Sequence, residues 1–357
     1  GVLQSVGMRA AVYEEFRGPV TVHKVDDPVS DDNGVVLRVE ATGVCRSDWH
    51  GWMGHDTDIH LPHVPGHELA GIVEVVGKNV RKWKADDRVT VPFVCACGSC
   101  AQCDSGNHQV CDRQTQPGFT HWGSYAEFVA IDYADTNLIA LPDNIDFVAA
   151  AALGCRFATS FRAMVAQGAI KPGNWVAIHG CGGAGLSAVM IARALDARVI
   201  AVDVDDEALA LARKVGAELA VSAATSASVV DEIVELTHGG VHTSVDAFGS
   251  AVTCFNSIAN LRKRGRHVQV GLMAGDDYQP RLPMELVIAR ELEIVGSHGM
   301  QAFEYPKMLR MISDGRLAPG ELVRQTVDLE HAAVSLGDPA SLHVAGVTVI
   351  DRFRPSH

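Results

Sequence analysis

The sequence has no long apolar run and few basic residues. Lys and Arg total 30 against 43 Asp and Glu over 357 residues, so the formal net charge is -13. No stretch approaches the ~18 apolar residues of a membrane-spanning helix, and the first residues lack the charged-then-apolar pattern of a secretory signal. An acidic surface repels phosphate backbones, and the short basic cluster at 262–266 is typical of a solvated turn. We therefore expect a cytoplasmic protein that binds neither membranes nor nucleic acid.

The length predicts two domains, because single hydrophobic cores seldom grow beyond about 250 residues. Residues 8–155 alternate short β-rich runs with Gly, Pro and Asp, which indicates a mostly β domain. Residues 156–296 alternate strands with helical runs, which indicates a parallel α/β sheet, and residues 297–357 are expected to rejoin the first domain. We interpret residues 1–7 as vector-derived, since a start at Met8 leads straight into a strand-like run.

Five of the nine cysteines lie between Cys95 and Cys111. A disulfide framework is disfavoured, because the compartment is reducing and the number of thiols is odd. Two interpretations of these cysteines remain: a zinc module that binds a partner, and a structural metal lobe carried by an enzyme. Within 95–111, four cysteines have the spacing C-x₂-C-x₂-C-x₇-C, namely Cys97, Cys100, Cys103 and Cys111. This spacing lets a single loop coordinate a tetrahedral zinc ion. An iron–sulfur run has another spacing and a following Pro. Cys95 is predicted to be a buried bystander or, alternatively, to act near the substrate channel, because it lies two residues after Phe93.

A glycine fingerprint follows the apolar run that begins at Trp175. Gly180, Gly182 and Gly185 form G-x-G-x-x-G at the start of a helical run, where a tight turn and helix N–H groups can hold a pyrophosphate. The next strand ends at Asp203, whose carboxylate can accept hydrogen bonds from ribose hydroxyls and would repel a 2′-phosphate. The pattern predicts NAD rather than NADP.

Zinc-type ligands also occur elsewhere, as Cys45 in "GVCRSDWHGW", His67 in "PGHELAG" and Cys155 in "ALGCRFATSF". Together with the cysteine loop and the glycine fingerprint, and in this order, these motifs resemble the zinc-dependent medium-chain alcohol dehydrogenases over essentially the whole chain after Met8. The resemblance implies a GroES-like catalytic domain, with a Rossmann domain inserted before the C-terminal segment. It also implies two zinc ions per chain.

The resemblance implies roles for the residues around the first three motifs. Cys45, His67 and Cys155 correspond to the catalytic zinc ligands, a set that leaves one coordination position open for substrate. Glu68 is close enough to exchange with water at the metal, and Asp48 orients His67. Ser47 and His50 correspond to the two ends of a proton relay. Zinc would acidify the alcohol hydroxyl, and the hydride would pass to the nicotinamide.

The resemblance also implies further contacts. Arg46 corresponds to a pyrophosphate contact and Thr159 to a nicotinamide contact, and the other expected cofactor residues are Gly183, Val270 and Leu272, besides the fingerprint glycines and Asp203. Many relatives carry a basic residue where this chain has Val347. NAD binding would therefore depend more on Arg46 and on the dipole of the helix that follows the fingerprint. The expected substrate pocket is lined by Phe93, Trp52, Trp49, Trp122 and Met300, which suits a medium-chain or aromatic alcohol, aldehyde or ketone.

Several alternatives stay open at the level of sequence. Many polyol and amino-alcohol dehydrogenases of the same superfamily use an acidic third ligand where this chain has Cys155, which favours the simple-alcohol interpretation. A non-enzymatic zinc protein would not bind NAD, and a zinc-free quinone reductase would lack the three ligands. We expect a homo-oligomer, either a dimer or a tetramer.

Overall fold

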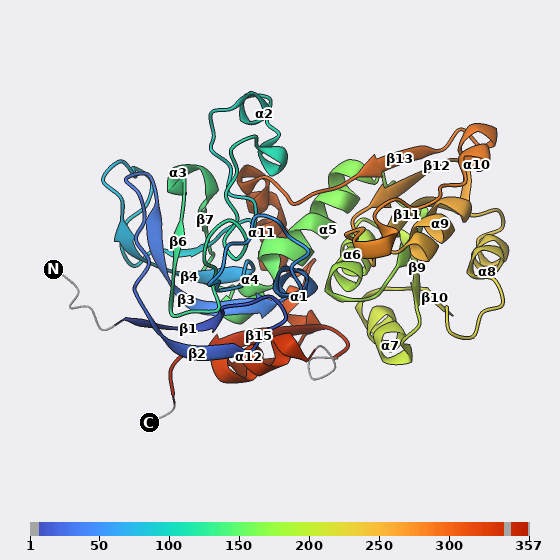
Figure 1. The fold of residues 1–357 in the computed structure, drawn as a ribbon. Helices are drawn as coiled ribbons and strands as arrows, with labels where there is room; N and C mark the ends of the chain where they lie inside the picture. Colours follow the sequence, from blue (N-terminus) through green and yellow to red (C-terminus); the bar gives the residue numbers. More distant parts are fainter. Residues whose placement is uncertain (1–6, 339–343, 356–357) are drawn as a thin grey trace. The chain divides into compact units, whose positions relative to one another are not determined.

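The structure is a computed structural model that describes residues 7–338 and 344–355. Residues 1–6, most of the segment interpreted as vector-derived, lie outside the described residues. The chain divides into two compact units (Figure 1). The first holds the chain up to Ala158 together with Gly299–Gly315 and Val323–His357, and the second holds Thr159–His298 and Arg316–Leu322. None of the described helices is long and apolar enough to cross a membrane.

The first unit is built on strands that are mostly antiparallel. β1 pairs with β2, and a larger sheet runs in the order β14-β15-β3-β4-β5-β7, with β6 also paired to β3. Only β14 and β15 pair in parallel in this sheet as described. The strands are β1 (Met8–Tyr13), β2 (Val20–Val25), β3 (Val35–Val44), β4 (Leu69–Val76), β5 (Arg88–Thr90), β6 (Phe128–Ile131), β7 (Ile139–Ala140), β14 (Val323–Asp328) and β15 (Val347–Arg352).

The alternating pattern of β3 explains how this sheet buries one face. Val35, Leu37 and Val39 are buried in the core of the unit. Between them, Arg38 points to the other face, where it forms ion pairs with Glu40 and with a carboxylate of β4. Successive side chains of a strand point to opposite faces. Because one face of β3 is buried, its pairing register with β4 is fixed, and with it the positions of the strand ends. Those ends lead into Cys45 and follow His67.

Short helices connect and cover these strands. The Asp146 side chain caps one of them by accepting a hydrogen bond from the Ala149 amide. That helix continues into a π-helical turn, which carries Cys155. The helical segments of the first unit are α1 (Arg46–Trp52), α2 (Ala101–Asp104), η1 (His108–Val110), α3 (Ala134–Asn137), α4 (Phe147–Ala151), η2 (Leu153–Phe157), η5 (Ala302–Glu304), α11 (Tyr305–Ser313) and α12 (Leu329–Gly337).

The second unit contains a parallel sheet in the order β10-β9-β8-β11-β12-β13. Numbered from β8, this is the 3-2-1-4-5-6 order of the Rossmann fold, which reverses direction between β8 and β11. The strands are β8 (Trp175–His179), β9 (Arg198–Asp203), β10 (Leu219–Ser222), β11 (Val241–Asp246), β12 (Leu261–Gln269) and β13 (Glu293–Gly296). The two units confirm the predicted architecture, a β-rich domain with a Rossmann domain.

Helices connect the parallel strands, as right-handed crossovers require. Several begin with a side-chain cap, and Asp205, Ser228 and Ser250 each accept a hydrogen bond from an amide of the first turn. The helical segments are η3 (Ala163–Gln167), α6 (Gly183–Ala194), α7 (Asp206–Val215), α8 (Val229–Leu236), α9 (Ala251–Ala259), η4 (Gly275–Asp277), α10 (Met284–Ala289) and η6 (Pro319–Leu322). α5 (Ala158–Arg162) begins with Ala158 of the first unit, and its other residues belong to the second.

Candidate functional site

The glycine fingerprint forms the turn between β8 and α6 in the second unit. Gly180 has a φ of +91°, which L side chains rarely adopt. A Cβ added to Gly185 would lie 1.7 Å from the Gly180 carbonyl oxygen, so this position requires glycine for the helix to pack against the turn. A Cβ added to Gly182 would meet no atom of the described chain within 4 Å. The turn therefore leaves open space at the N-terminus of α6, where Gly183 begins the helix.

Asp203 lies at the end of β9, beside this turn. Its carboxylate accepts hydrogen bonds from the Cys181 amide (2.6 Å) and from the Asp205 amide (2.9 Å). These two bonds hold the carboxylate next to the fingerprint, where a dinucleotide would place its adenosine ribose. The next side chains, Val204 to Glu207, include three acidic and no basic residues.

The other cofactor residues implied by the resemblance are distributed over both units. In the second unit, Thr159 carries a buried hydroxyl without a hydrogen-bond partner among the described residues. Val270 follows β12 and donates its amide to the Asp246 carbonyl oxygen (3.0 Å), whereas the Leu272 side chain is exposed. In the first unit, Arg46 is exposed at the start of α1. Val347, also in the first unit, is buried at the start of β15.

Cys45, His67 and Cys155 converge in the first unit. Their ligand atoms all lie within 4.8 Å of one another. Cys45 precedes α1, His67 lies in the loop before β4, and Cys155 lies in the π-helical turn η2. Such π turns are rare and occur frequently at functional sites. Three segments that are distant in the sequence thus bring two sulfurs and one imidazole together.

Asp48 holds this arrangement in place. One carboxylate oxygen accepts hydrogen bonds from His67 Nδ1 (2.9 Å) and from the Gly66 amide (3.0 Å), and the other accepts from the Cys45 amide (3.1 Å). Burial lowers the pKa of His67, but the charge of Asp48 and this hydrogen bond raise it well above its usual value. Because Nδ1 is bonded to Asp48, Nε2 is the ring nitrogen that is left to bind a metal beside the two sulfurs.

His67 Nε2 provides a test of whether the site fits a metal. The atom is buried and has no hydrogen-bond partner in the described part of the chain. Leaving a buried polar atom unpaired costs about 1–3 kcal/mol, so such an atom in a folded protein calls for a ligand. Two sulfurs and one imidazole are the ligand types that zinc prefers. The residues therefore fit a zinc ion.

A hydrogen bond links the sulfurs of Cys45 and Cys155. A hydrogen bond between them lowers the pKa of Cys45 well below its usual value, although burial opposes this effect, and the same bond raises the pKa of Cys155. Arg156 also favours the Cys45 thiolate through its positive charge. These contacts favour the thiolate form of Cys45, and thiolates are the form that zinc binds.

Glu68 lies beside the site and is engaged by Arg156. The Arg156 amide donates to Glu68 Oε1 (2.8 Å), and the Arg156 guanidinium forms a buried ion pair with both carboxylate oxygens. Burial raises the pKa of Glu68, and the charge of Arg156 opposes that rise. Sequence reasoning missed Arg156, although it directly follows Cys155. The expected exchange of Glu68 with water at the metal stays a prediction.

Ser47 and His50, the expected relay residues, both lie on α1. They are three residues apart, so their side chains lie on the same side of the helix. Both are half-buried. Burial, the positive charge of Arg46 and, when it is protonated, His55 lower the pKa of His50 to about 4. His50 is therefore neutral at physiological pH, as a proton acceptor must be.

Aromatic rings surround His67. The Phe93 ring lies 6.3 Å from the His67 ring between centroids, and the Phe119 ring lies 5.1 Å away. Phe93 was expected from the resemblance, whereas Phe119, in the loop "PGFTHWG", was missed. Phe119 is buried, and its ring lies closer to the His67 ring than the Phe93 ring does. These two rings make the surroundings of the site apolar.

The other expected pocket residues have structural contacts. Trp52 packs in a core cluster with Tyr13 and Leu336, and its indole N–H donates to the Gly18 carbonyl oxygen (2.9 Å). The Trp122 indole donates to the Pro62 carbonyl oxygen (2.9 Å). Met300 is buried, and Trp49 packs edge-on against His50 and His55. Their role in a pocket stays a prediction.

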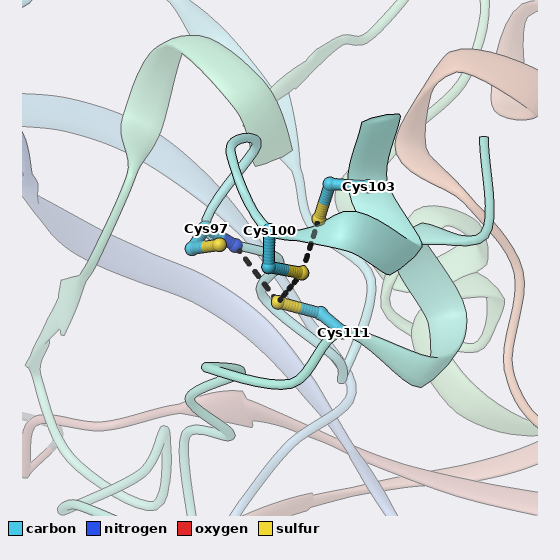
Figure 2. Close-up of side chains that lie close together, drawn as sticks. All are labelled: Cys97, Cys100, Cys103 and Cys111. Atoms are coloured by element: carbon cyan, nitrogen blue, oxygen red, sulfur yellow. Dashed lines mark hydrogen bonds between the residues drawn. The ribbon is translucent and has the colours of Figure 1, made fainter. Parts of the chain in front are cut away.

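The cysteine loop forms the other group of potential metal ligands in the described chain (Figure 2). The sulfurs of Cys97, Cys100, Cys103 and Cys111 all lie within 4.8 Å of one another, and Cys95 is buried outside the group. Cys100 Sγ lies 3.5 Å from Cys103 Sγ and 3.7 Å from Cys111 Sγ. A disulfide requires about 2.05 Å, whereas a zinc tetrahedron with bonds of about 2.3 Å has edges of about 3.8 Å. The spacing fits a zinc ion.

Backbone amides support this arrangement. The Cys97 and Arg113 amides each donate to Cys111 Sγ (3.3 Å), and the Ser99 amide donates to Cys97 Sγ (3.5 Å). Burial opposes ionisation of Cys97, but the Ser99 amide and the neighbouring sulfurs lower its pKa to about 6. In Figure 2 the four side chains point inward from a single loop. Every coordination position of a tetrahedral ion would be filled, so this group has no place for a substrate.

Comparisons with known proteins agree with this description. Residues 31–143 match the alcohol dehydrogenase GroES-like domain, and residues 183–314 match the zinc-binding dehydrogenase family. An alcohol dehydrogenase from Geobacillus stearothermophilus is 36% identical over 316 residues, which are 87% of this chain and 90% of that protein. The chain therefore belongs to the zinc-dependent medium-chain alcohol dehydrogenase family.

Solved structures show the same fold. The alcohol dehydrogenase TADH from Thermus sp. ATN1 has a TM-score of 0.88 and 28% identity, covering 97% of this chain and 100% of that chain. A zinc-binding dehydrogenase from Sinorhizobium meliloti, whose structure holds NADP, has a TM-score of 0.87 and 26% identity, covering 98% and 99%. An NAD-dependent alcohol dehydrogenase has a TM-score of 0.86 and 29% identity, covering 96% and 99%. The structures similar to this chain therefore do not all use one nucleotide.

Proposed function

We propose that this chain is an NAD-dependent alcohol dehydrogenase with a catalytic zinc ion at Cys45, His67 and Cys155 and a structural zinc ion at the cysteine loop. The observation that carries the proposal is the convergence of the three ligands around His67 Nε2, a buried atom without a partner among the described residues. The substrate would be an alcohol, or in reverse an aldehyde or ketone.

Each residue of the site would have a distinct role in alcohol oxidation. Bound zinc supplies a Lewis acid that acidifies the substrate hydroxyl, and bound NAD supplies the hydride acceptor. Asp48 fixes the proton on His67 Nδ1 and so aims Nε2 at the metal position. Arg156 neutralises the buried charge of Glu68. Ser47 and His50 take up the proton that the alcohol releases.

The surroundings of His67 support an apolar substrate. Phe93 and Phe119 both face the imidazole, and aromatic rings favour alkyl or aromatic groups over the hydroxyl groups of a polyol. Neither ring can donate or accept a conventional hydrogen bond. We therefore infer that medium-chain or aromatic alcohols fit this site better than polyols.

The test is an activity screen of the purified, zinc-loaded chain with NAD. Primary, secondary and aromatic alcohols should produce NADH, which is measured by its absorbance, and polyols should react more slowly. A chain that binds zinc and NADH but oxidises none of these alcohols would contradict the proposal. Turnover of polyols alone would instead support the polyol dehydrogenase alternative.

Asp203 is expected to select NAD, because its carboxylate lies beside the fingerprint turn without a basic neighbour among residues 204–207. Asp203→Ser should narrow the ratio of kcat/KM for NAD over NADP by about 10- to 100-fold, since removal of the carboxylate removes repulsion of the 2′-phosphate. Steady-state kinetics with both cofactors measure the ratio.

Asp206→Ser is the matched control, because it removes the same charge from the first turn of α7. That variant should keep the ratio close to the wild-type value. If both variants narrowed the ratio equally, general charge would explain the preference. If Asp203→Ser left the ratio unchanged, the selection would lie elsewhere.

A further inference from the structure

His50 faces a second histidine that the proposed mechanism does not use. Its Nδ1 atom lies 2.9 Å from Nδ1 of His55, and the two ring centroids are 5.2 Å apart. His50 is half-buried on α1, whereas His55 is exposed in the segment that follows the helix. At this distance the two nitrogens share one hydrogen bond, so one carries the proton and the other accepts it.

The local backbone holds His55 in this position. The His55 amide donates to the His50 carbonyl oxygen (3.0 Å), and Gly54, with a φ of +82°, turns the chain back after α1. Trp49 packs edge-on against both imidazoles, with centroid distances of 5.0 Å to His50 and 6.0 Å to His55. The pair therefore rests on a backbone hydrogen bond, a glycine turn and an aromatic support.

The direction of the shared hydrogen bond decides what His50 can do. A neutral imidazole has one N–H donor and one lone pair, and the hydrogen bond at one nitrogen determines which role is left for the other. If His50 Nδ1 donates to His55, then His50 Nε2 keeps its lone pair. If His50 Nδ1 accepts instead, Nε2 carries a proton and His50 cannot take another from the alcohol.

We propose that His55 is a positioning residue that accepts the hydrogen bond of His50 Nδ1 and thereby keeps His50 Nε2 available to receive the proton of the alcohol. This inference rests on the proposed function. The alcohol's proton binds Nε2, and His50 becomes an imidazolium whose Nδ1–H bond to neutral His55 is strengthened by the charge. The Nε2 proton then leaves to water, and the pair returns to its starting state.

The charges around His50 make this support necessary. Burial and the guanidinium of Arg46 disfavour the imidazolium, a positive charge on His55 would disfavour it as well, and the Cys45 thiolate favours it. His55 is the group in hydrogen-bond contact with the imidazole. A neutral acceptor there stabilises the transient cation without adding a permanent charge beside the expected pyrophosphate contact, Arg46.

The experiment compares His55→Ala, His55→Asn and His60→Ala in the zinc-loaded enzyme. His55→Ala should lower kcat for alcohol oxidation about tenfold at neutral pH. General acid–base catalysis contributes about 10²–10⁴-fold to a rate, and the loss of a positioning residue should remove part of this. The Kd of NADH should stay unchanged. The defect should shrink as pH rises, because hydroxide can then take the proton directly. His55→Asn, whose side-chain oxygen can accept the bond, should recover most of the rate. His60→Ala removes another exposed histidine of the segment and should have no effect.

The outcomes separate this inference from the proposed function. An active wild type with a His50→Ala defect, but with no defect in His55→Ala, would overturn the role of His55 and leave the dehydrogenase intact. A defect in His55→Ala that is equal at every pH and is not recovered by His55→Asn would indicate a structural role and would also overturn it. A wild type without dehydrogenase activity would contradict the proposed function itself.

Discussion

Cys45→Ser should abolish alcohol oxidation while NADH binding stays measurable. The sulfur of Cys45 is buried among the ligand atoms of His67 and Cys155, and its pKa lies well below the usual value, so it is the thiolate on which the proposed metal site depends. A serine hydroxyl is not ionised at neutral pH and is a harder, shorter ligand. Because the Lewis acid supplies several kcal/mol of stabilisation, kcat should fall at least about a thousandfold. Zinc content per chain should fall from two towards one.

Cys254→Ser provides the control for this variant. Cys254 is also a buried thiol, but it lies on α9 in the second unit. Its substitution should leave zinc content and turnover near the wild-type values. NADH binding, measured by intrinsic tryptophan fluorescence, shows that the Cys45→Ser chain is folded. Normal turnover by Cys45→Ser in a sample of known zinc content would exclude Cys45 as a catalytic ligand.

The parts of the site that come from one short segment were predictable from the sequence. The fingerprint turn needs a positive φ at Gly180 and close packing at Gly185, and both requirements are local to one strand–turn–helix segment. The cysteine loop is likewise one segment, and its spacing alone sufficed to predict that its four sulfurs gather.

The convergence of Cys45, His67 and Cys155 could not be predicted from spacing. Each lone residue has an ordinary interpretation as a buried or polar side chain, and only the resemblance to a family joined them. Their meeting depends on the ends of β3 and β4 and on a π-helical turn, for which the sequence carries no recognisable signal. Tertiary packing fixes such features, so they become visible only in the structure.

The residues that sequence reasoning missed act through long-range contacts. Arg156 pairs with Glu68, and Phe119 packs against His67 from a loop far along the chain. An adjacent position was a usable clue for Arg156, because it follows Cys155 directly. For Phe119 the clue was weaker, since an aromatic residue between Gly118 and Thr120 is as typical of a core as of a site. The sequence carries no signal for His55, because its hydrogen bond to His50 depends on the turn at Gly54.

Cys100→Ala should remove the structural zinc ion and lower thermal stability. The loop between Cys97 and Cys111 contains few apolar side chains, and its buried cluster consists of Ala96 together with the cysteines. A segment of this composition cannot order itself by hydrophobic burial, so metal binding contributes to its folding. Without one ligand, three sulfurs are left in a site that is built for four. Zinc content should fall from two per chain towards one, and Tm should fall by several degrees.

The chemistry should survive this loss wherever the chain remains folded, because the loop has no open coordination position and supplies no ligand to the site at His67. The KM values of the folded fraction should therefore stay close to normal, in contrast to the loss of turnover in Cys45→Ser. Cys95→Ala is the matched control, since Cys95 is a buried thiol of the same segment that lies outside the four-sulfur group. It should retain two zinc ions per chain. If Cys100→Ala also retained two zinc ions and melted at the wild-type temperature, the cysteine loop would not be a structural zinc site.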